Sequence, residues 1–151
     1  MIDPGFAWAD QSWAGLPLKN CVIYELRVGT YTAAGIFDAV VSQRAEIKEL
    51  GVSAIELMPV AQFPGSRNRG YDSVQPFAVE DSYGGPQGLK RLVNPCHQIG
   101  LAVILDVVYN RLGPQGNYLA DLGPYFTDRN KTHWGGLALN FDGPDSEPVR
   151  R

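Results

Sequence analysis

Apolar residues follow two kinds of pattern along the chain, and these patterns predict the order of its elements. Continuous apolar runs, bounded by polar or turn residues, are typical of strands buried on both faces. Between these runs apolar residues recur at helical spacing, with Gly51 placed to end one helix and Pro86 to begin the next. The patterns predict strands over 21–28, 53–59 and 101–109, and helices over 36–50 and 84–100.

The order strand, helix, strand, helix, strand is typical of parallel βαβ units with right-handed crossovers. Two α/β architectures contain such units, an open doubly wound sheet and a (β/α)8 barrel. The first predicted strand continues into GTYTAAG, which matches neither of the glycine-rich phosphate-binding patterns. The sequence therefore predicts a partial (β/α)8 TIM barrel, with about the first three parallel strands, two helices and a long loop after the third strand. We expect residues 1–20 to be an irregular lead-in or linker and residues 21–151 to be the N-terminal part of the barrel.

Composition and charge limit the classes of partner that we expect for the protein. Of its 151 residues 44% are apolar and 19% are charged, and the net charge of -3 gives no reason to expect nucleic acid or an anionic membrane. No apolar stretch reaches the roughly 18 residues that span a bilayer. The N-terminus lacks the basic and apolar regions of a signal peptide. We expect a cytoplasmic protein with no nucleic-acid partner and no membrane partner, in which Cys21 and Cys96 are unpaired thiols.

One acid lies within each predicted strand, namely Glu25, Glu56 and Asp106. A carboxylate in an apolar interior needs a cation or hydrogen bonds, and for Glu25 and Glu56 a structural polar network is the favoured interpretation. Asp106 differs, because it lies near the carboxyl end of its strand with Asn110 on the same face. That end of the strands carries the active site in barrels, so Asp106 and Asn110 are predicted to form a site.

The loop RNRGYDS, 67–73, places Tyr71 and Asp72 after the second predicted strand, again at the carboxyl end. An aromatic ring beside an acid can hold a sugar, with the ring against its apolar face and the carboxylate accepting from its hydroxyls. The alternative is an ordinary polar turn with Tyr71 packed on the barrel rim. Neither His97 nor His133 has a metal partner at ligand spacing, so we expect no metal and no cofactor.

Three segments carry a resemblance to a known family. VIYELRVGTYT, GVSAIELMPVAQFPGSRNRGYD and LDVVYNRLGPQGNYL resemble successive segments of the α-amylase superfamily, glycoside hydrolase family 13. The resemblance implies a catalytic barrel that acts on α-glucans by a retaining mechanism, with a carboxylate nucleophile and a second carboxyl group as acid and base. It implies that Asp106 and Asn110 hold the sugar whose bond is cut and that Tyr71 stacks on it. With Asp72 and Arg111, these are the predicted substrate-binding residues.

The last segment, YFTDRNKTHWGGLALNFDGPDSEPVRR, resembles family members that hydrolyse the α-1,4 bond next to the terminal trehalose of maltooligosyltrehalose, an α-glucan substrate, and release trehalose. Glycogen branching enzymes, which transfer α-glucan chains, share the earlier motifs, and a non-catalytic sugar- or anion-binding module is the alternative from another class. The nucleophile and the acid/base belong to the fourth and fifth strands of the family's barrel. We therefore expect no catalytic residue before Arg151, and a fragment that is inactive by itself.

Five positions depart from the family pattern or from a local rule. Arg111 stands where the family has a sugar-contacting histidine, Arg27 where YELHVG is usual, and Arg69 in place of the tryptophan of a WGYD turn. Arg44 interrupts the apolar stripe of the first predicted helix, and Pro95 lies inside the second, at a cost of about 3 kcal/mol. Two hypotheses follow: a decayed or imperfectly read copy, and an arginine-lined pocket for an anionic ligand.

Overall fold

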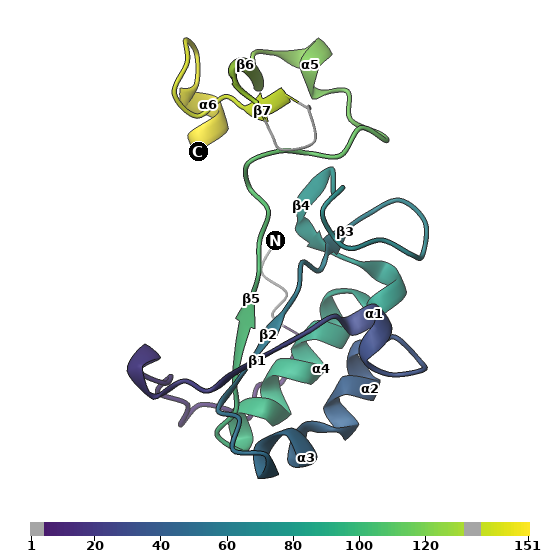
Figure 1. The fold of residues 1–151 in the computed structure, drawn as a ribbon, viewed down its shortest axis with the longest axis vertical. Helices are drawn as coiled ribbons and strands as arrows, with labels where there is room; N and C mark the ends of the chain where they lie inside the picture. Colours follow the sequence, from purple (N-terminus) through teal and green to yellow (C-terminus); the bar gives the residue numbers. More distant parts are fainter. Residues whose placement is uncertain (1–4, 132–136) are drawn as a thin grey trace.

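Three parallel strands form the central sheet of the computed structural model, which describes residues 5–131 and 137–151 (Figure 1). The strands are β1 (Ile23–Leu26), β2 (Ala54–Leu57) and β5 (Ala102–Leu105), in the order β1-β2-β5. Their register pairs Glu25 with Glu56, and Glu56 with Ile104. The connections between them contain helices that lie on one side of the sheet. This arrangement confirms the prediction of a partial α/β barrel.

The helix predicted over 36–50 is two short helices, and this prediction of a single helix is wrong. They are α2 (Phe37–Ser42) and α3 (Arg44–Glu49), with the break at Gln43. The break falls where Arg44 interrupts the apolar stripe, and there the Arg44 guanidinium donates to the Val41 carbonyl over 2.8 Å. A straight helix would instead carry this cation along its apolar face, where a buried charge is unfavourable.

The second predicted helix is present as α4 (Gly85–Gln98), which contains Pro95. The helix continues past the proline, with Leu92 and Cys96 fully buried on the face toward the sheet. Pro95 therefore does not end α4, because burial of the apolar face stabilises the turns on either side.

The apolar core lies between the sheet and the helices and includes Phe37, Ile55, Leu57, Leu92 and Leu101, all with no exposed surface. The opposite face of β1 is open.

On that open face Glu25 is exposed and Glu56 is half-buried. Among the described residues no further strand covers Glu25, so its place in a structural polar network stays a prediction.

A short antiparallel hairpin follows β2 and was not predicted. It consists of β3 (Ala61–Gln62) and β4 (Gln75–Val79), and the glycine- and arginine-rich loop forms its tip. The buried carboxylate of Glu80 closes its base, because it accepts hydrogen bonds from the backbone N–H groups of Phe63 and Ser82 and from the Gln62 side chain, each over 2.9 Å. The hydrogen bonds of Glu80 thus fix the base of the hairpin that carries the loop.

The remaining elements are short. They are a 3-10 turn (Leu18–Asn20), α1 (Val28–Tyr31), a second 3-10 turn (Asp81–Tyr83), α5 (Leu119–Leu122), β6 (Phe126–Lys131), β7 (Leu137–Leu139) and α6 (Glu147–Arg150). Strands β6 and β7 pair in antiparallel fashion, and with α5 and α6 they lie beyond the carboxyl end of the sheet (Figure 1).

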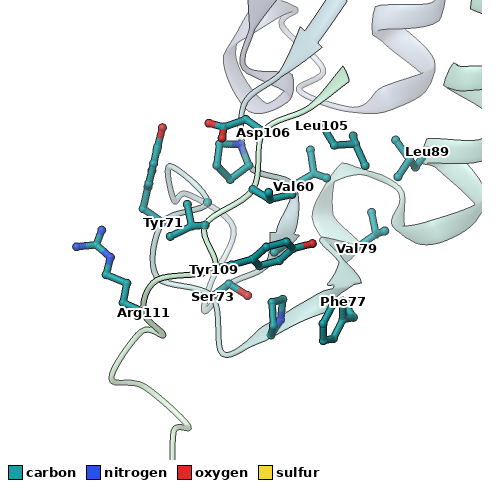
Figure 2. Close-up of a pocket in the computed structure, with 17 residues that line it drawn as sticks. Val60, Tyr71, Ser73, Phe77, Val79, Leu89, Leu105, Asp106, Tyr109 and Arg111 are labelled. Carbon is teal, nitrogen blue, oxygen red and sulfur yellow. The ribbon is translucent and has the colours of Figure 1, made fainter. Parts of the chain in front are cut away.

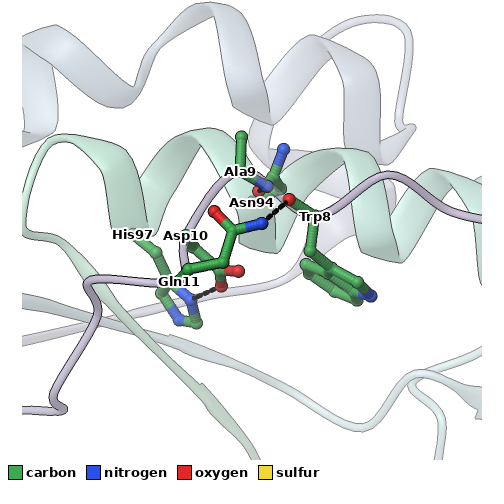
Figure 3. A network of polar contacts seen from close by, with 6 residues as sticks. All are labelled: Trp8, Ala9, Asp10, Gln11, Asn94 and His97. Atoms are coloured by element: carbon green, nitrogen blue, oxygen red, sulfur yellow. Dashed lines mark hydrogen bonds and ion pairs between the residues drawn. The ribbon is translucent and has the colours of Figure 1, made fainter.

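The segment before β1 has irregular backbone and contacts α4 (Figure 3). The backbone N–H of Ala9 donates to the Asn94 side chain over 2.8 Å, and Asp10 lies 2.6 Å from Nδ1 of His97. The Trp13 ring stacks on the same imidazole, with ring centroids 4.6 Å apart. His97 thus joins the lead-in to α4, whereas His133 lies outside the described residues.

Two further expectations from the sequence concern the cysteines and the length of the helices. Cys21 and Cys96 are free thiols, as expected. Among the described residues, none of the helices has both the length and the apolar character that crossing a bilayer requires.

Candidate functional site

The site lies at the carboxyl ends of β2 and β5. The backbone N–H of Asp106 donates to the Leu57 carbonyl over 2.9 Å, which continues the ladder one residue past β5. Asp106 therefore follows the strand and does not lie within it, because β5 ends at Leu105 rather than at Tyr109. Further along, the Asn110 carbonyl accepts from the backbone of β7 over 3.1 Å.

The turn that carries Tyr71 is packed against the end of β2. Gly70 has a φ of +80°, and a Cβ added there would lie 2.1 Å from the Pro59 carbonyl oxygen. Only glycine fits this position without displacing backbone. The Asn68 side chain accepts from the Gly70 N–H over 2.9 Å, and Arg27 donates to the Asn68 carbonyl over 3.0 Å. Arg27, which departs from the family pattern, therefore holds the turn in place.

A second backbone contact joins this turn to the segment that follows Asp106. The Gly113 N–H donates to the Ser73 carbonyl over 2.9 Å. A Cβ at Gly113 would lie 2.1 Å from the Asp72 carbonyl oxygen, so this approach also requires glycine. The two segments that supply the site are thus fixed relative to one another by backbone contacts.

Tyr71 interacts with the acids of the site. Burial raises the pKa of its hydroxyl above the ordinary value of 10.0, and the carboxylates of Asp106 and Glu25 raise it further, while Arg69 opposes them. A hydrogen bond with Asp106 also raises the pKa, and Figure 2 shows the hydroxyl end of Tyr71 on the side of that carboxylate. Tyr71 therefore keeps its proton near neutral pH and can donate to an acceptor.

Four of the five predicted site residues line one cavity. This cavity, called here the acidic-side cavity, has a volume of about 540 Å³ and is lined by Tyr71, Asp106, Asn110 and Arg111, together with Val107, Val108, Tyr109 and Phe141. It offers an aromatic ring, a carboxylate, an amide and a cation within one open hollow. These groups can bind the hydroxyls and the apolar face of a sugar ring.

Asp72 does not line the acidic-side cavity. It is exposed and lines a second hollow of about 740 Å³, called here the arginine-side cavity, whose lining residues are Met58, Arg67, Asn68, Arg69, Tyr71, Asp72 and Arg111. Tyr71 and Arg111 are common to both cavities. The structure thus places the two predicted acids in different cavities.

An aromatic pair beside the site was missed by the sequence analysis. Phe77 of β4 is 90% exposed, and its ring centroid lies 6.1 Å from that of Tyr109. Both rings line a pocket of about 220 Å³ that also reaches Tyr71 and Asp106 (Figure 2). The pair went unnoticed because hairpin β3–β4, which carries Phe77 to this position, was not predicted.

Groups that could bind a metal do not gather at the site. Within 5–131 and 137–151, no three His, Cys, Asp or Glu side chains come together in a way that could hold an ion. The groups that do gather are those suited to hydrogen bonding and ring stacking.

The fold agrees with what comparison with known proteins shows. The alpha-amylase catalytic-domain model matches residues 22–134, and the chain belongs to this family. It is 52% identical over its whole length to a malto-oligosyltrehalose trehalohydrolase of Saccharolobus solfataricus, and 49% identical over 99% of its length to that of Arthrobacter ramosus.

A solved structure agrees as well. A Salmonella typhimurium protein assigned as an alpha amylase is 40% identical and superposes with a TM-score of 0.90 over 99% of this chain. The chain covers 27% and 26% of the two trehalohydrolases and 25% of the Salmonella chain. It therefore spans about a quarter of the length of the relatives it matches.

Proposed function

We propose that the chain is the N-terminal part of the catalytic barrel of an enzyme that hydrolyses the α-1,4 bond next to the terminal trehalose of maltooligosyltrehalose, releasing trehalose. The observation that carries the proposal is the convergence of Tyr71, Asp106 and Asn110 on one cavity at the carboxyl end of the sheet. The choice of substrate is supported by the names of the two relatives that are about half identical over the chain.

In this proposal the residues of the chain bind and orient the sugar. The Tyr71 ring packs against the apolar face of the glucose unit, and the Asp106 carboxylate accepts hydrogen bonds from its hydroxyls. Asn110 has both a donor and an acceptor for the neighbouring hydroxyls. Bond cleavage in a retaining glycosidase requires two carboxyl groups about 5–5.5 Å apart. We assign these two groups to later strands of the barrel, outside residues 1–151.

The proposal includes the organisation of the chain. Residues 21–151 would form part of the barrel and residues 1–20 its lead-in, which is held to α4 through the contacts of Asp10 and Trp13 with His97. The cytoplasmic location and the absence of nucleic-acid and membrane partners stay predictions from sequence.

The test is made in the full-length protein with maltooligosyltrehalose as substrate and released trehalose as the readout. Asp106→Asn removes the charge while keeping the shape of the side chain. Loss of a charged hydrogen bond costs about 1.5–3 kcal/mol, so we expect kcat/KM to fall by about ten- to a hundredfold. Asp121→Asn, at an exposed acid of α5 that lines none of the cavities described above, is the matched control and should leave kcat/KM unchanged.

Two results would contradict the proposal. The first is an equal effect of the two substitutions, which would mean that Asp106 does not contact substrate. The second is formation of branched glucan without release of trehalose, which would assign the enzyme to chain transfer.

A further inference from the structure

Three arginines, Arg67, Arg69 and Arg111, line the arginine-side cavity. Arg67 and Arg69 come from the turn before Tyr71, and Arg111 from the segment after β5. Within the part of the chain that the structure describes, none of the three makes a side-chain hydrogen bond or an ion pair. Arg111 is half-buried.

Most other arginines of the chain are engaged; Arg129 of β6 is the exception among the described residues. Arg27 and Arg44 donate to backbone carbonyls, Arg91 binds the carboxylate of Asp38, and Arg150 donates to a carbonyl. Unengaged guanidinium groups are therefore concentrated at the cavity beside Tyr71, where they come from two separate segments of the chain.

The charges of the arginine-side cavity do not cancel. Among the described residues, Asp72 is the one acid that lines it, and the Asp72 carboxylate already accepts from the Asn68 side chain over 3.4 Å. Three guanidinium groups therefore line this cavity with a single carboxylate, which already accepts a hydrogen bond. Asp106 lines the acidic-side cavity and not the arginine-side cavity, whereas Tyr71 and Arg111 line both.

We propose that the arginine-side cavity binds the phosphate group of a phosphorylated α-glucan whose sugar ring lies on Tyr71. This proposal rests on the proposed function, because it uses the same sugar position. A guanidinium group presents two parallel N–H donors that match the oxygens of phosphate. Three such groups can serve the three free oxygens of a phosphate ester, whereas a carboxylate offers only two oxygens. Phosphate is therefore the better match for the cavity.

The experiment is calorimetric titration of the full-length protein at low salt. The probes are maltose, maltose 6′-phosphate, maltobionate and inorganic phosphate. We expect maltose 6′-phosphate to bind at least about tenfold more tightly than maltose, since one charged hydrogen bond accounts for that factor. We expect a smaller gain for the carboxylate of maltobionate, and a fall of the phosphate gain with added salt because the cavity is open to solvent.

Substitutions test whether the arginines cause the tighter binding of maltose 6′-phosphate. Arg67→Gln and Arg69→Gln should each reduce the ratio of the maltose and maltose 6′-phosphate dissociation constants by about tenfold, whereas Arg69→Lys should give an intermediate ratio. Arg129→Gln, at an exposed arginine of β6 that does not line the cavity, should leave the ratio unchanged. Measuring both glutamine variants keeps the test decisive if one of them does not fold.

The outcomes separate this proposal from the proposed function. Equal affinity for maltose and maltose 6′-phosphate, or a ratio that neither glutamine variant changes, overturns the phosphate site and leaves the sugar site intact. Binding of inorganic phosphate that depends on Arg67 and Arg69, with no binding of maltose, supports an anion site and contradicts the proposed function. No binding of any probe contradicts both.

Discussion

The contact between Gly70 and Pro59 gives the sharpest prediction about the backbone that positions Tyr71. Gly70→Ala introduces two separate penalties. The left-handed backbone, at a φ of +80°, costs a residue with a Cβ about 1–2 kcal/mol. The new Cβ would also lie 2.1 Å from the Pro59 carbonyl oxygen, where ordinary contact begins at 3.4 Å. Forcing atoms into a packed site costs about 1–3 kcal/mol, so we expect a total loss of about 2–5 kcal/mol.

Gly65→Ala is the matched control, because it lies in the same loop with a φ of +74° and has no atom within 4 Å of its added Cβ. It should lose only the backbone penalty of about 1–2 kcal/mol. The free energy of unfolding is measured by urea titration of the full-length protein, and the rate of trehalose release is measured in parallel. Displacement of Tyr71 by about 1 Å can reduce the rate by about a hundredfold, so Gly70→Ala should lose far more activity than Gly65→Ala.

Equal losses of stability and of activity in the two variants would refute this reasoning. They would show that the Pro59 carbonyl moves away at no cost, and that the turn carrying Tyr71 is not fixed by its contact with β2.

Three further predictions follow. Asp106→Asn should lower the pKa of Tyr71, because a carboxylate that raises it is lost; tyrosinate absorbance would then appear at lower pH than in the wild type, and an unchanged titration would contradict the contact. Because the folded-state pKa of Tyr71 is raised, its contribution to stability is full below pH 10.0 and is lost as the pH rises through the folded-state pKa, so this alkaline loss should shrink in the variant. Arg111→His should raise activity on neutral maltooligosyltrehalose and reduce the preference for a phosphorylated glucan; a histidine variant with neither effect would show that Arg111 does not contact the ligand. Isolated residues 1–151 should show no trehalose release and should associate in size-exclusion chromatography, since Ile23 on the open β1 edge is 44% exposed; a monomer with sharp thermal unfolding would contradict this.

The parallel sheet could be predicted because its strands are continuous apolar runs. β2 illustrates this, since Ile55 and Leu57 have no exposed surface and both pack toward the helices. The position of Asp106 at the carboxyl end followed from the same pattern, although the strand ends four residues earlier than its apolar run suggests. Apolar residues past the end of a strand line the site, so hydrophobicity alone does not mark that boundary.

The hairpin and the break in the first helix could not be predicted, for different reasons. β3 is only two residues long. The buried carboxylate of Glu80, which holds it, comes after the whole loop and β4 in the sequence. The break at Gln43 depends on where the Arg44 guanidinium finds an acceptor, which a count of apolar positions does not reveal. Both features are decided by hydrogen bonds of individual polar side chains.

The arrangement of the site explains why arginines at 69 and 111 are compatible with the family fold. The turn is held to the end of β2 by the close approach of Gly70 to Pro59 and by the bond from Arg27 to the Asn68 carbonyl, and it is held to the segment after β5 by the backbone contacts of Gly113. None of these contacts uses the side chain of Arg69 or Arg111. Substitution at these two positions therefore changes the charge around Tyr71 without moving the backbone that positions it.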